Sequence, residues 1–381
     1  MVILTWLLTI LYFSLILTFI RTWIKLSEET IDLTGIKSQI RFSIIIPVRN
    51  EEENIRALLE DISKQEYAQD RYEVIVVDDH STDGTVEKVK SFIHDFPNFF
   101  LIELDLKSPV ISYKKKAIES GIHLSKGDVI ITTDGDCRVK ERWLQSINEL
   151  IVKTGAVCVC GPVTYIKEDR FFTKLQTIEF AALLGSGAAT ITQKLPGMCN
   201  GANLAYKKEA FDSVEGFKGI DNINSGDDEL LMHKLLKRYP DDVLFLKNQE
   251  GIVYTKANRD LNELYNQRKR WAGKWSYYKS NEVKVLAIFI FVFNAYIALG
   301  GIFVLTGLLN VKIFLFHFLL KALIEATFII LVLKFLKKKI HLFHLLLLQI
   351  VYPFYTIFFG IVANFGGYVW KDRKVNGKQD D

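Results

Sequence analysis

The chain has 381 residues, of which 49% are hydrophobic and 24% are charged, and its formal net charge is +4. This length suits one large domain or two modest domains. The net charge is small and basic residues flank apolar segments, which favours membrane contact and disfavours a nucleic-acid partner. Its four cysteines are Cys137, Cys158, Cys160 and Cys199. They fit a reducing compartment, and no second ligand pair accompanies Cys158 and Cys160, so we expect no zinc site.

The chain begins with an apolar segment. Residues 1–20 carry no charge, and Arg21 and Lys25 follow them. Such a length spans the roughly 30 Å hydrocarbon core of a bilayer. A cleaved signal peptide has basic residues before a shorter apolar core. The order is reversed here, so we expect an uncleaved transmembrane anchor over 1–25.

Residues 42–163 alternate between short apolar runs typical of buried strands and stretches with apolar residues at helical spacing. Asn50 and Glu53 resemble a capping box for the first helix of this region. Alternation of strands and amphipathic helices predicts an α/β fold with a mostly parallel sheet and right-handed crossovers. We expect strands over 42–48, 72–79, 99–104, 128–133 and 156–163, and helices over 50–65, 83–96, 114–126 and 142–153.

Two of these strands end on acids, Asp78-Asp79 and Asp134-Gly135-Asp136. Ligands of parallel sheets bind at the carboxyl ends of strands, so the acids are expected to converge on one cleft. Two close carboxylates raise each other's pKa unless a cation neutralises them. Oxygen ligands suit Mg²⁺ or Mn²⁺, which keep open positions for phosphate oxygens. The alternative is an ordinary surface turn, since "DGD" is a common turn sequence.

The segment of about 171–200 is apolar but rich in small and polar residues. It is too polar to span a membrane, so we expect an amphipathic segment at the interface that lets a lipid acceptor reach the site. A buried core helix is the alternative.

Residues 285–370 are apolar again and predict a membrane domain of about three helices, followed by a polar tail over 371–381. Basic residues at 21–25, 268–274 and 337–339 favour a cytoplasmic face and a cytoplasmic soluble domain. Four spans would place the tail outside, whereas its basic start favours the inside, so its side stays open. Lys321 and Glu325 stand four positions apart in this apolar region and are expected to pair with each other, with a substrate contact as the alternative.

Seven stretches resemble motifs of inverting glycosyltransferases of family 2, in the order found there. They are "SIIIPVRNEEENI", "EVIVVDDHSTDGT", "YKKKAIESG", "TTDGDC", "NGANLAYKKEAF", "SGDDELL" and "QRKRW". The resemblance covers about 40–280 and implies a GT-A fold, in which a Rossmann-like nucleotide-sugar-binding half precedes an acceptor half. The apolar segments on either side resemble those of membrane-bound members.

The resemblance implies a role for individual residues on the donor side. Asp79, alone or with Asp78, is similar to the carboxylate that contacts uridine. Pro47 and Glu51 match the region lining the nucleotide. Lys114 matches the lysine that lies near the base and ribose of the nucleotide. Asp134 and Asp136 match the DxD pair that holds the metal and the diphosphate.

The resemblance also implies the catalytic and closing residues. Asp228 in "GDDE" matches the catalytic base, and Asp227 replaces the usual glutamate before it, which leaves open which of the two is the base. Gln267, Arg270 and Trp271 match QxxRW, which closes over the diphosphate and the acceptor. For that stretch the alternative is a basic run at the membrane surface, with Lys269 and Lys274 facing lipid. Asn200, Gly201 and Asn203 of "NGAN" match the pocket for the donor sugar and the acceptor.

The leading hypothesis is therefore a multi-pass protein of the cell inner membrane that is a hexosyltransferase. It moves a sugar from a nucleotide-diphosphate sugar, a UDP-sugar by the resemblance, to a lipid or lipid-linked acceptor and uses a divalent cation. The alternative is a processive polysaccharide synthase subunit. About four spans are few for a secretion channel, although a partner subunit could supply more.

Three other classes fit less well. A transporter needs more spans, with broken helices in matching halves. A non-catalytic sensor could lack the base or the DxD pair, and both are present. A nucleotidyltransferase should carry a Gly-rich loop after its first strand, where this chain has "PVRNEEEN".

Overall fold

The computed structural model describes residues 2–28, 40–105, 111–278, 280–371 and 373–375. These form two compact units. The helical unit comprises Met1–Lys25, Lys167–Leu195 and Ala257–Asp381, and the α/β unit comprises Leu26–Ile166 and Pro196–Lys256. The α/β unit ends at Lys256, and the extent of the expected GT-A domain over about 40–280 stays a prediction.

The α/β unit is built on a seven-stranded sheet in the order β3-β2-β1-β4-β7-β5-β8. Only β7 runs antiparallel to its neighbours, so the predicted mostly parallel sheet is confirmed. The strands are β1 (Phe42–Val48), β2 (Tyr72–Asp78), β3 (Phe99–Glu103), β4 (Val129–Thr132), β5 (Cys158–Cys160), β7 (Leu204–Lys207) and β8 (Val243–Phe245). A small parallel pair, β6 (Val163–Tyr165) and β9 (Val253–Thr255), lies apart from this sheet.

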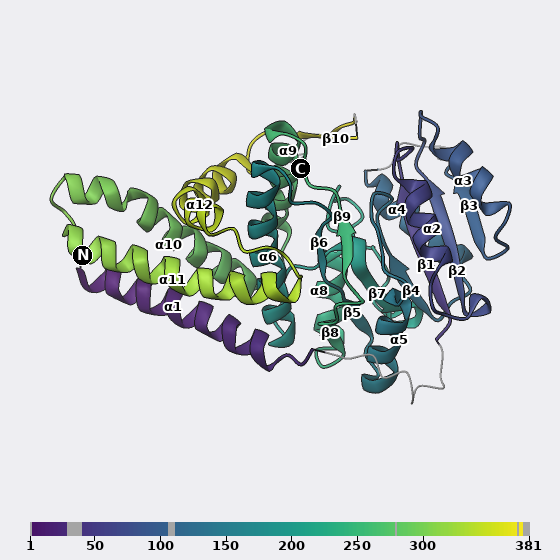
Figure 1. Cartoon of the computed structure of the whole chain (residues 1–381), viewed down its shortest axis with the longest axis horizontal. Coiled ribbons are helices and arrows are strands. Elements are labelled where there is room, and N and C mark those ends of the chain that lie inside the picture. The colour runs from purple at the N-terminus through teal and green to yellow at the C-terminus, as the bar shows by residue number, and fades with distance from the viewer. Residues whose placement is uncertain (1, 29–39, 106–110, 279, 372, 376–381) are drawn as a thin grey trace. The chain divides into compact units, whose positions relative to one another are not determined.

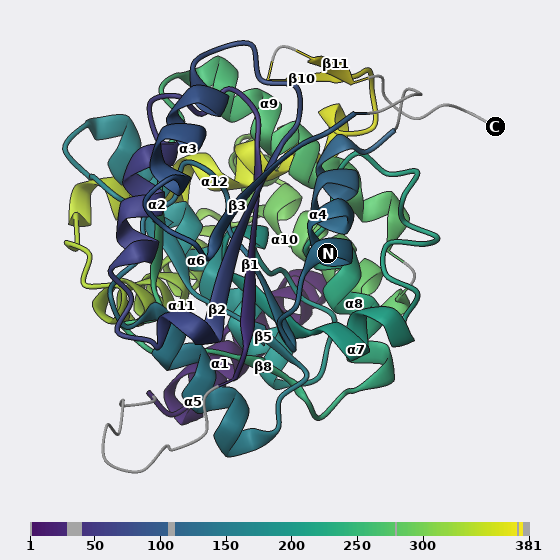
Figure 2. The same cartoon turned by 90° about the vertical axis from the view of Figure 1, so that its right-hand side faces the viewer.

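Helices cover the sheet because its central strands are apolar on both faces. All residues of β2 and nearly all of β1 are buried, which is typical of parallel strands covered on two sides. Figure 2 shows β1 and β2 side by side, with α4 on one side and α2 and α3 on the other. The helices of this unit are α2 (Ile55–Ser63), α3 (Thr85–Ile93), α4 (Tyr113–Leu124), α5 (Trp143–Thr154), α7 (Lys208–Ser213) and α8 (Glu229–Arg238), with 3₁₀ turns η1 (Gln69–Arg71) and η2 (Gly201–Asn203).

The start of α2 differs from the prediction. The predicted capping box of Asn50 and Glu53 is wrong, because the N-cap of α2 is Asn54 and Asn50 lies in the left-handed region at φ 51°. Instead, Asn50 Oδ1 accepts a hydrogen bond from the backbone N–H of Thr82 at 2.9 Å. The backbone N–H of Asn50 donates to Ser81 Oγ at 2.9 Å. Asn50 therefore joins the loops that follow β1 and β2, which reach the same edge of the sheet.

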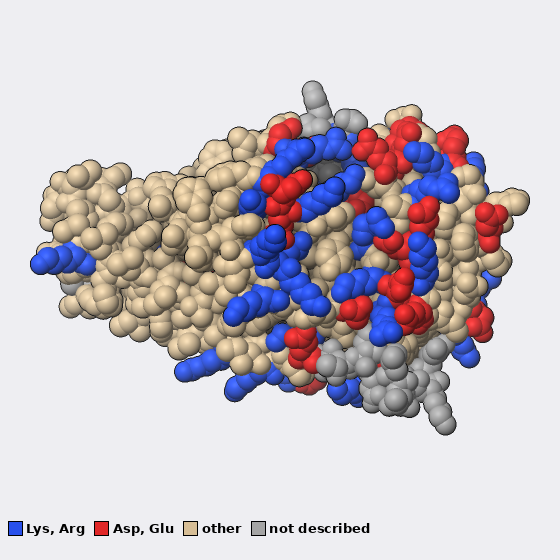
Figure 3. Space-filling view, viewed as in Figure 1, with Lys and Arg blue, Asp and Glu red and all other residues tan. Residues whose placement is uncertain are grey.

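The helical unit contains the long apolar helices. Four of its helices, α1, α10, α11 and α12, are long and apolar enough to cross a membrane, which indicates a membrane-associated protein. Figure 1 shows α1, α10 and α11 side by side, and Figure 3 shows few charged residues over the helix ends around the connection between α10 and α11. The elements of this unit are α1 (Val2–Lys25), α6 (Phe171–Thr192), α9 (Leu261–Ala272), α10 (Asn281–Leu305), α11 (Val311–Phe335), α12 (Leu342–Val362), a 3₁₀ turn η3 (Gly273–Tyr277) and the hairpin β10 (Tyr368–Trp370) and β11 (Arg373–Val375).

Helix α6 packs against α1, α11 and α12 within the helical unit. A Cβ atom on Gly185 would lie only 2.6 Å from Val332 Cγ2, so glycine allows α6 and α11 to approach closely. The position of α6 at a lipid interface stays a prediction.

Polar contacts also tie the apolar helices together. The expected pairing of Lys321 with Glu325 is confirmed, since Lys321 Nζ lies 2.9 Å from Glu325 Oε2. The same ammonium lies 3.2 Å from Gln349 Oε1 of α12. Buried charges in apolar surroundings require such partners.

Candidate active site

The acids predicted to share a cleft come from strands at the middle of the sheet. Asp78 is the last residue of β2, and Asp134 and Asp136 follow β4, with β1 between these two strands. The three strands are parallel, so their carboxyl ends meet at the same edge of the sheet. Gly135 is required for close packing there, because a Cβ atom would lie 2.9 Å from Val48 Cγ1 at the end of β1.

The loop after β2 holds the residues predicted to contact the nucleotide. Both Asp78 and Asp79 are buried. Asp79 Oδ1 lies 3.0 Å from His80 Nδ1, and Asp78 Oδ2 accepts a hydrogen bond from the amide of Ser81 at 3.1 Å. The guanidinium of Arg49 donates to the carbonyl oxygens of Asp79 and His80, both at 2.7 Å. Which of the two aspartates meets a nucleotide stays open.

Two residues of the first strand and its loop complete that side. Pro47 is half-buried near the end of β1, in register with Val77 of β2. Glu51 is buried, and its Oε2 accepts a hydrogen bond from Asn54 Nδ2 at 2.6 Å. Their contacts with a nucleotide stay predictions.

Lys114 connects the acids after β4 with the acid pair that precedes α8. Its Nζ lies 2.8 Å from Asp134 Oδ1 and 3.1 Å from Asp227 Oδ2. Burial by itself lowers the pKa of Lys114, but the charges of Asp134, Asp227 and Asp228 together raise it above its ordinary value. Lys114 is therefore a cation between two carboxylates. Its contact with the base and ribose of a nucleotide stays a prediction.

Asp228, the N-cap residue of α8, accepts hydrogen bonds from two backbone N–H groups, one at the start of α8 and one in η2. Its Oδ1 accepts from the amide of Glu229 at 2.6 Å and its Oδ2 from the amide of Gly201 at 3.0 Å. Gly201 is in turn held by the Thr132 hydroxyl of β4, which donates to the Gly201 carbonyl at 2.7 Å. A Cβ atom on Gly201 would lie 3.1 Å from Asp227 Oδ2, so this position favours glycine. The structure thus brings together residues that are far apart in the sequence.

The two predicted pocket asparagines make contacts with the protein itself. The Asn200 side chain accepts from the amide two residues further on, at 2.9 Å. Asn203 is buried, and its amide nitrogen donates to the carbonyls of Pro162 and Gly251 at 2.9 and 2.8 Å. Its oxygen accepts from the Trp143 indole at 3.0 Å. A direct role of either residue in a ligand pocket stays a prediction.

The two predicted metal ligands are not buried. Asp134 and Asp136 are both partly exposed, and Asp136 Oδ2 accepts a hydrogen bond from the Thr255 hydroxyl at 3.1 Å. Among the residues that the structure describes, no group of three His, Cys, Asp or Glu side chains could hold a metal. Mg²⁺, however, is commonly bound by one or two carboxylates together with substrate phosphates. Two partly exposed carboxylates at the sheet edge fit that kind of site.

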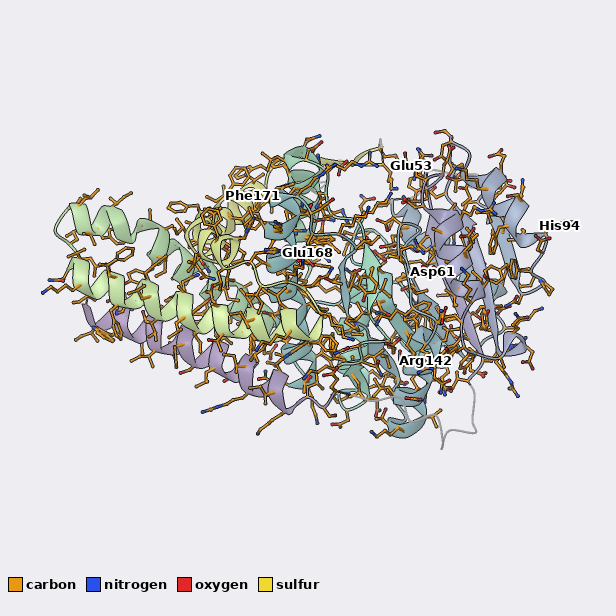
Figure 4. The ribbon with its side chains drawn as sticks, in the orientation of Figure 1. Glu53, Asp61, His94, Arg142, Glu168 and Phe171 are labelled. Atoms are coloured by element: carbon orange, nitrogen blue, oxygen red, sulfur yellow. The ribbon has the colours of Figure 1, made fainter. Side chains whose placement is uncertain are left out.

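Ion pairs fix the segment that follows Asp136. The Arg138 guanidinium makes two hydrogen bonds to the Asp61 carboxylate of α2, at 2.5 and 2.7 Å. Arg142 Nε lies 2.6 Å from Glu66 Oε2. Asp61 and Arg142 are labelled in Figure 4, where both lie in the α/β unit. The backbone of Arg138 also bridges to that of Tyr254. The loop carrying the predicted metal ligands is therefore anchored on two sides.

The residues predicted to close over the diphosphate lie on α9 of the helical unit. Gln267 Oε1 accepts a hydrogen bond from Asn258 Nδ2 at 2.9 Å. Trp271 stacks with Phe180 of α6, at 6.1 Å between ring centroids. Within the described ranges of the chain, the Arg270 guanidinium has no ion pair and is partly exposed. The contacts of these residues with a diphosphate stay predictions.

Sequence reasoning missed the residue that holds α9 in place. Arg268 makes two hydrogen bonds to the Glu179 carboxylate of α6, at 3.0 and 2.7 Å, and Tyr355 of α12 donates to the same carboxylate at 2.7 Å. Arg268 also donates to Gln267 Oε1 at 2.5 Å, and its Cζ lies 4.3 Å from the Trp271 ring centroid. The signal in the sequence is Glu179, a lone carboxylate in an apolar segment, because such a group requires a buried cationic partner.

The interpretation of Lys269 and Lys274 as lipid-facing is wrong. Both side chains are buried within the protein. Lys269 Nζ lies 5.6 Å from the ring centroid of Tyr265, one turn earlier on α9. A run of basic residues in the sequence does not indicate which of their side chains are buried in the folded protein.

Comparisons with known proteins agree with this fold. The model of the family described as Glycosyl transferase family 2 matches residues 43–214, and that of Glycosyl transferase family group 2 matches residues 129–367, more than half of the chain. A solved structure, mannosyltransferase PcManGT from Pyrobaculum calidifontis in complex with GDP-Man and Mn²⁺, is 17% identical with a TM-score of 0.53, and the match covers 94% of each chain. It supports a GT-A-like fold.

Two curated relatives share parts of the sequence. Glycosyltransferase AglE of Haloferax volcanii is 37% identical over 123 residues, which are 32% of this chain and 39% of the relative. Beta-monoglucosyldiacylglycerol synthase of Nostoc is 26% identical over 234 residues, which are 60% of this chain and 48% of the relative. The chain therefore spans less than half of the length of either relative. The family-model match covers most of the chain, and the protein belongs to glycosyl transferase family group 2.

Proposed function

We propose that this chain is an inverting hexosyltransferase that moves a sugar from a nucleotide-diphosphate sugar, by its motifs a UDP-sugar, to a lipid or lipid-linked acceptor. The observation that carries the proposal is the contact between Asp134, Lys114 and Asp227, beside an Asp228 carboxylate oriented by two amides. This arrangement supplies acids for a metal-bound diphosphate and a separate, oriented carboxylate for proton transfer.

Asp228 is the proposed base. It takes the proton of the acceptor hydroxyl while the acceptor oxygen bonds to the anomeric carbon, and the bond from that carbon to the diphosphate breaks on the opposite face. A positioned general base contributes about 10²–10⁴-fold to the rate. Asp227 is the weaker candidate, because its carboxylate is buried and paired with Lys114.

The donor side of the site binds nucleotide and diphosphate. Asp78, Asp79, Pro47 and Glu51 are the proposed contacts of the nucleotide. Asp134 and Asp136 would hold Mg²⁺ or Mn²⁺ together with the diphosphate oxygens, and the ion would stabilise the negative charge on the leaving group. PcManGT was solved in complex with GDP-Man and Mn²⁺, which supports this choice of cofactor and donor class.

Gln267, Arg270 and Trp271 remain proposed ligands of the diphosphate and the acceptor, and Asn200, Gly201 and Asn203 proposed parts of the sugar pocket. An arginine fork suits phosphate oxygens, and the Arg270 guanidinium has no ion pair among the described residues. Trp271 offers an amphipathic ring. The support for the closing role is the spacing of the three residues on α9.

The proposed acceptor is a lipid or lipid-linked glycan. The four long apolar helices among the described residues support a membrane-associated protein. A multi-pass topology in the cell inner membrane is part of the proposal, and the basic residues at 21–25, 268–274 and 337–339 favour a cytoplasmic α/β unit. The name of the Nostoc relative, a glucosyldiacylglycerol synthase, supports the same acceptor class. A processive polysaccharide synthase is the second candidate, which the number of candidate spans disfavours.

The test is a donor panel on detergent-solubilised protein with radiolabelled UDP-glucose, UDP-galactose, UDP-N-acetylglucosamine and GDP-mannose. We expect transfer from a UDP-sugar in the wild type, and a loss of about 10²-fold or more in Asp228→Asn. Asp95→Asn, on an exposed carboxylate, is the matched control. Extraction of the product into organic solvent separates a glycolipid from a polymer. Turnover of no donor, or full activity of Asp228→Asn, would refute the proposal.

A further inference from the structure

The segment between α7 and α8, residues 214–228, carries the acid pair of the proposed site. It contains no regular strand or α-helix, and its internal backbone hydrogen bonds are local turns, such as Ile220 N–H to the Phe217 carbonyl at 2.9 Å. Three of its backbone carbonyls nevertheless converge on one atom. Lys115 Nζ of α4 donates to the carbonyl oxygens of Ile220, Ile223 and Ser225 at 2.6, 2.7 and 2.8 Å.

The Lys115 ammonium is buried in the protein interior, where the three carbonyls are its hydrogen-bond acceptors. Lys115 is only 3% exposed, and a lysine ammonium has three N–H donors and no acceptor. Three carbonyls therefore match its three donors. A buried charge is costly unless it is compensated, so the alternative positions of this segment, which would remove a carbonyl from the ammonium, are disfavoured.

The anchored residues directly precede the acids. Ser225 is followed by Gly226, at φ 79°, then by Asp227 and Asp228. The neighbouring residue on α4, Lys114, contacts the Asp227 side chain at 3.1 Å. Two consecutive lysines of one helix thus hold the same segment, one through a carboxylate and the other through the backbone.

We infer that Lys115 is a positioning residue, which fixes the backbone of residues 220–225 and thereby sets where Asp228 meets the acceptor hydroxyl. The consequence for catalysis rests on the proposed function. The residue touches no reacting atom, so its loss should affect turnover more than donor binding. A misplacement of about 1 Å in a catalytic group can cost on the order of 10²-fold in rate.

The test compares Lys115→Met, which keeps the length of the side chain and removes its donors, with the matched control Lys116→Met. Lys116 is the next residue of α4, and it pairs with Glu119 at a partly exposed position. We expect Lys115→Met to lower kcat by about 10–10²-fold with the donor KM within about twofold, and Lys116→Met to change neither. Lys115→Gln keeps an amide donor and is expected to lie between these two, and it replaces Lys115→Met if the latter does not fold.

Hydrogen exchange of the same proteins gives the readout that is independent of activity. We expect amides of residues 218–226 to exchange about tenfold faster in Lys115→Met, while those of β1 and β2 stay protected. Unchanged exchange in this segment would overturn the anchoring role, and faster exchange with an unchanged kcat would overturn the positioning role. A wild-type protein that turns over no donor would instead contradict the proposed function, and the exchange result would still decide whether Lys115 holds the segment.

Discussion

The ion pair between Arg268 and Glu179 gives the sharpest prediction for the helical unit. The Arg268 and Glu179 side chains are only 4% and 8% exposed, and their atoms approach to 2.7 Å. Arg268→Met leaves the Glu179 carboxylate with the Tyr355 hydroxyl but without a counter-charge. Removing one partner of a buried pair costs about 3–5 kcal/mol. We therefore expect Arg268→Met to lower the free energy of unfolding by about that amount.

The double variant distinguishes burial of a charge from loss of packing. In Arg268→Met/Glu179→Met both charges are replaced by apolar side chains, a change that is often neutral or stabilising in buried pairs. We therefore expect the double variant to be more stable than Arg268→Met alone. The losses of unfolding free energy in the two single variants should sum to about 0.5–3 kcal/mol more than the loss in the double variant.

The assay is denaturant unfolding of the purified proteins in one detergent, with the slope and midpoint fitted for each member of the cycle. The control is Arg56→Met, which breaks the exposed pair of Arg56 with Glu60 on α2. A surface pair at this spacing contributes only about 0.3–0.5 kcal/mol. If Arg268→Met cost no more than this control, or if the two single costs simply added, the reasoning about a desolvated pair would be refuted.

Three further predictions concern the α/β unit. Gly201→Ala places a Cβ atom 3.1 Å from Asp227 Oδ2, so we expect kcat to fall by about tenfold. The control is Gly301→Ala, whose Cβ atom meets no atom within 4 Å and should leave kcat unchanged. The raised pKa of Lys114 means that its charge stabilises the fold at all pH values below its unfolded pKa of about 10.4 and is lost only as pH rises through the still higher folded value. The stability difference between wild type and Lys114→Met in denaturant titrations should therefore stay constant from about pH 6 to 9, and a change across that window contradicts the assignment. Removal of divalent cations by a chelator should abolish sugar transfer, and added Mg²⁺ or Mn²⁺ should restore it. Asp136→Asn should need a higher metal concentration for half-maximal activity. Metal-independent transfer by the wild type would exclude the proposed cofactor role.

Much of the fold could be predicted because its signals are local. All five predicted strands of the α/β unit form, with the last one divided into β5 and β6, because short apolar runs between turn residues carry their own pattern. The apolar lengths that predicted a membrane anchor and about three C-terminal helices correspond to α1, α10, α11 and α12. The capping box at Asn50 failed because a contact with the loop after β2 outweighs the local helix signal.

The amino-acid sequence by itself determined the order of strands and helices, the apolar spans and the acids at the ends of β2 and β4. These follow from periodicity and composition over a few residues. Only the tertiary structure decided which charges meet. Lys115 finds carbonyls 105 to 110 positions away, and Arg268 finds Glu179 at a separation of 89 positions. Such partners are chosen by burial, since a charge removed from water is stable only where the folded chain supplies its counterpart.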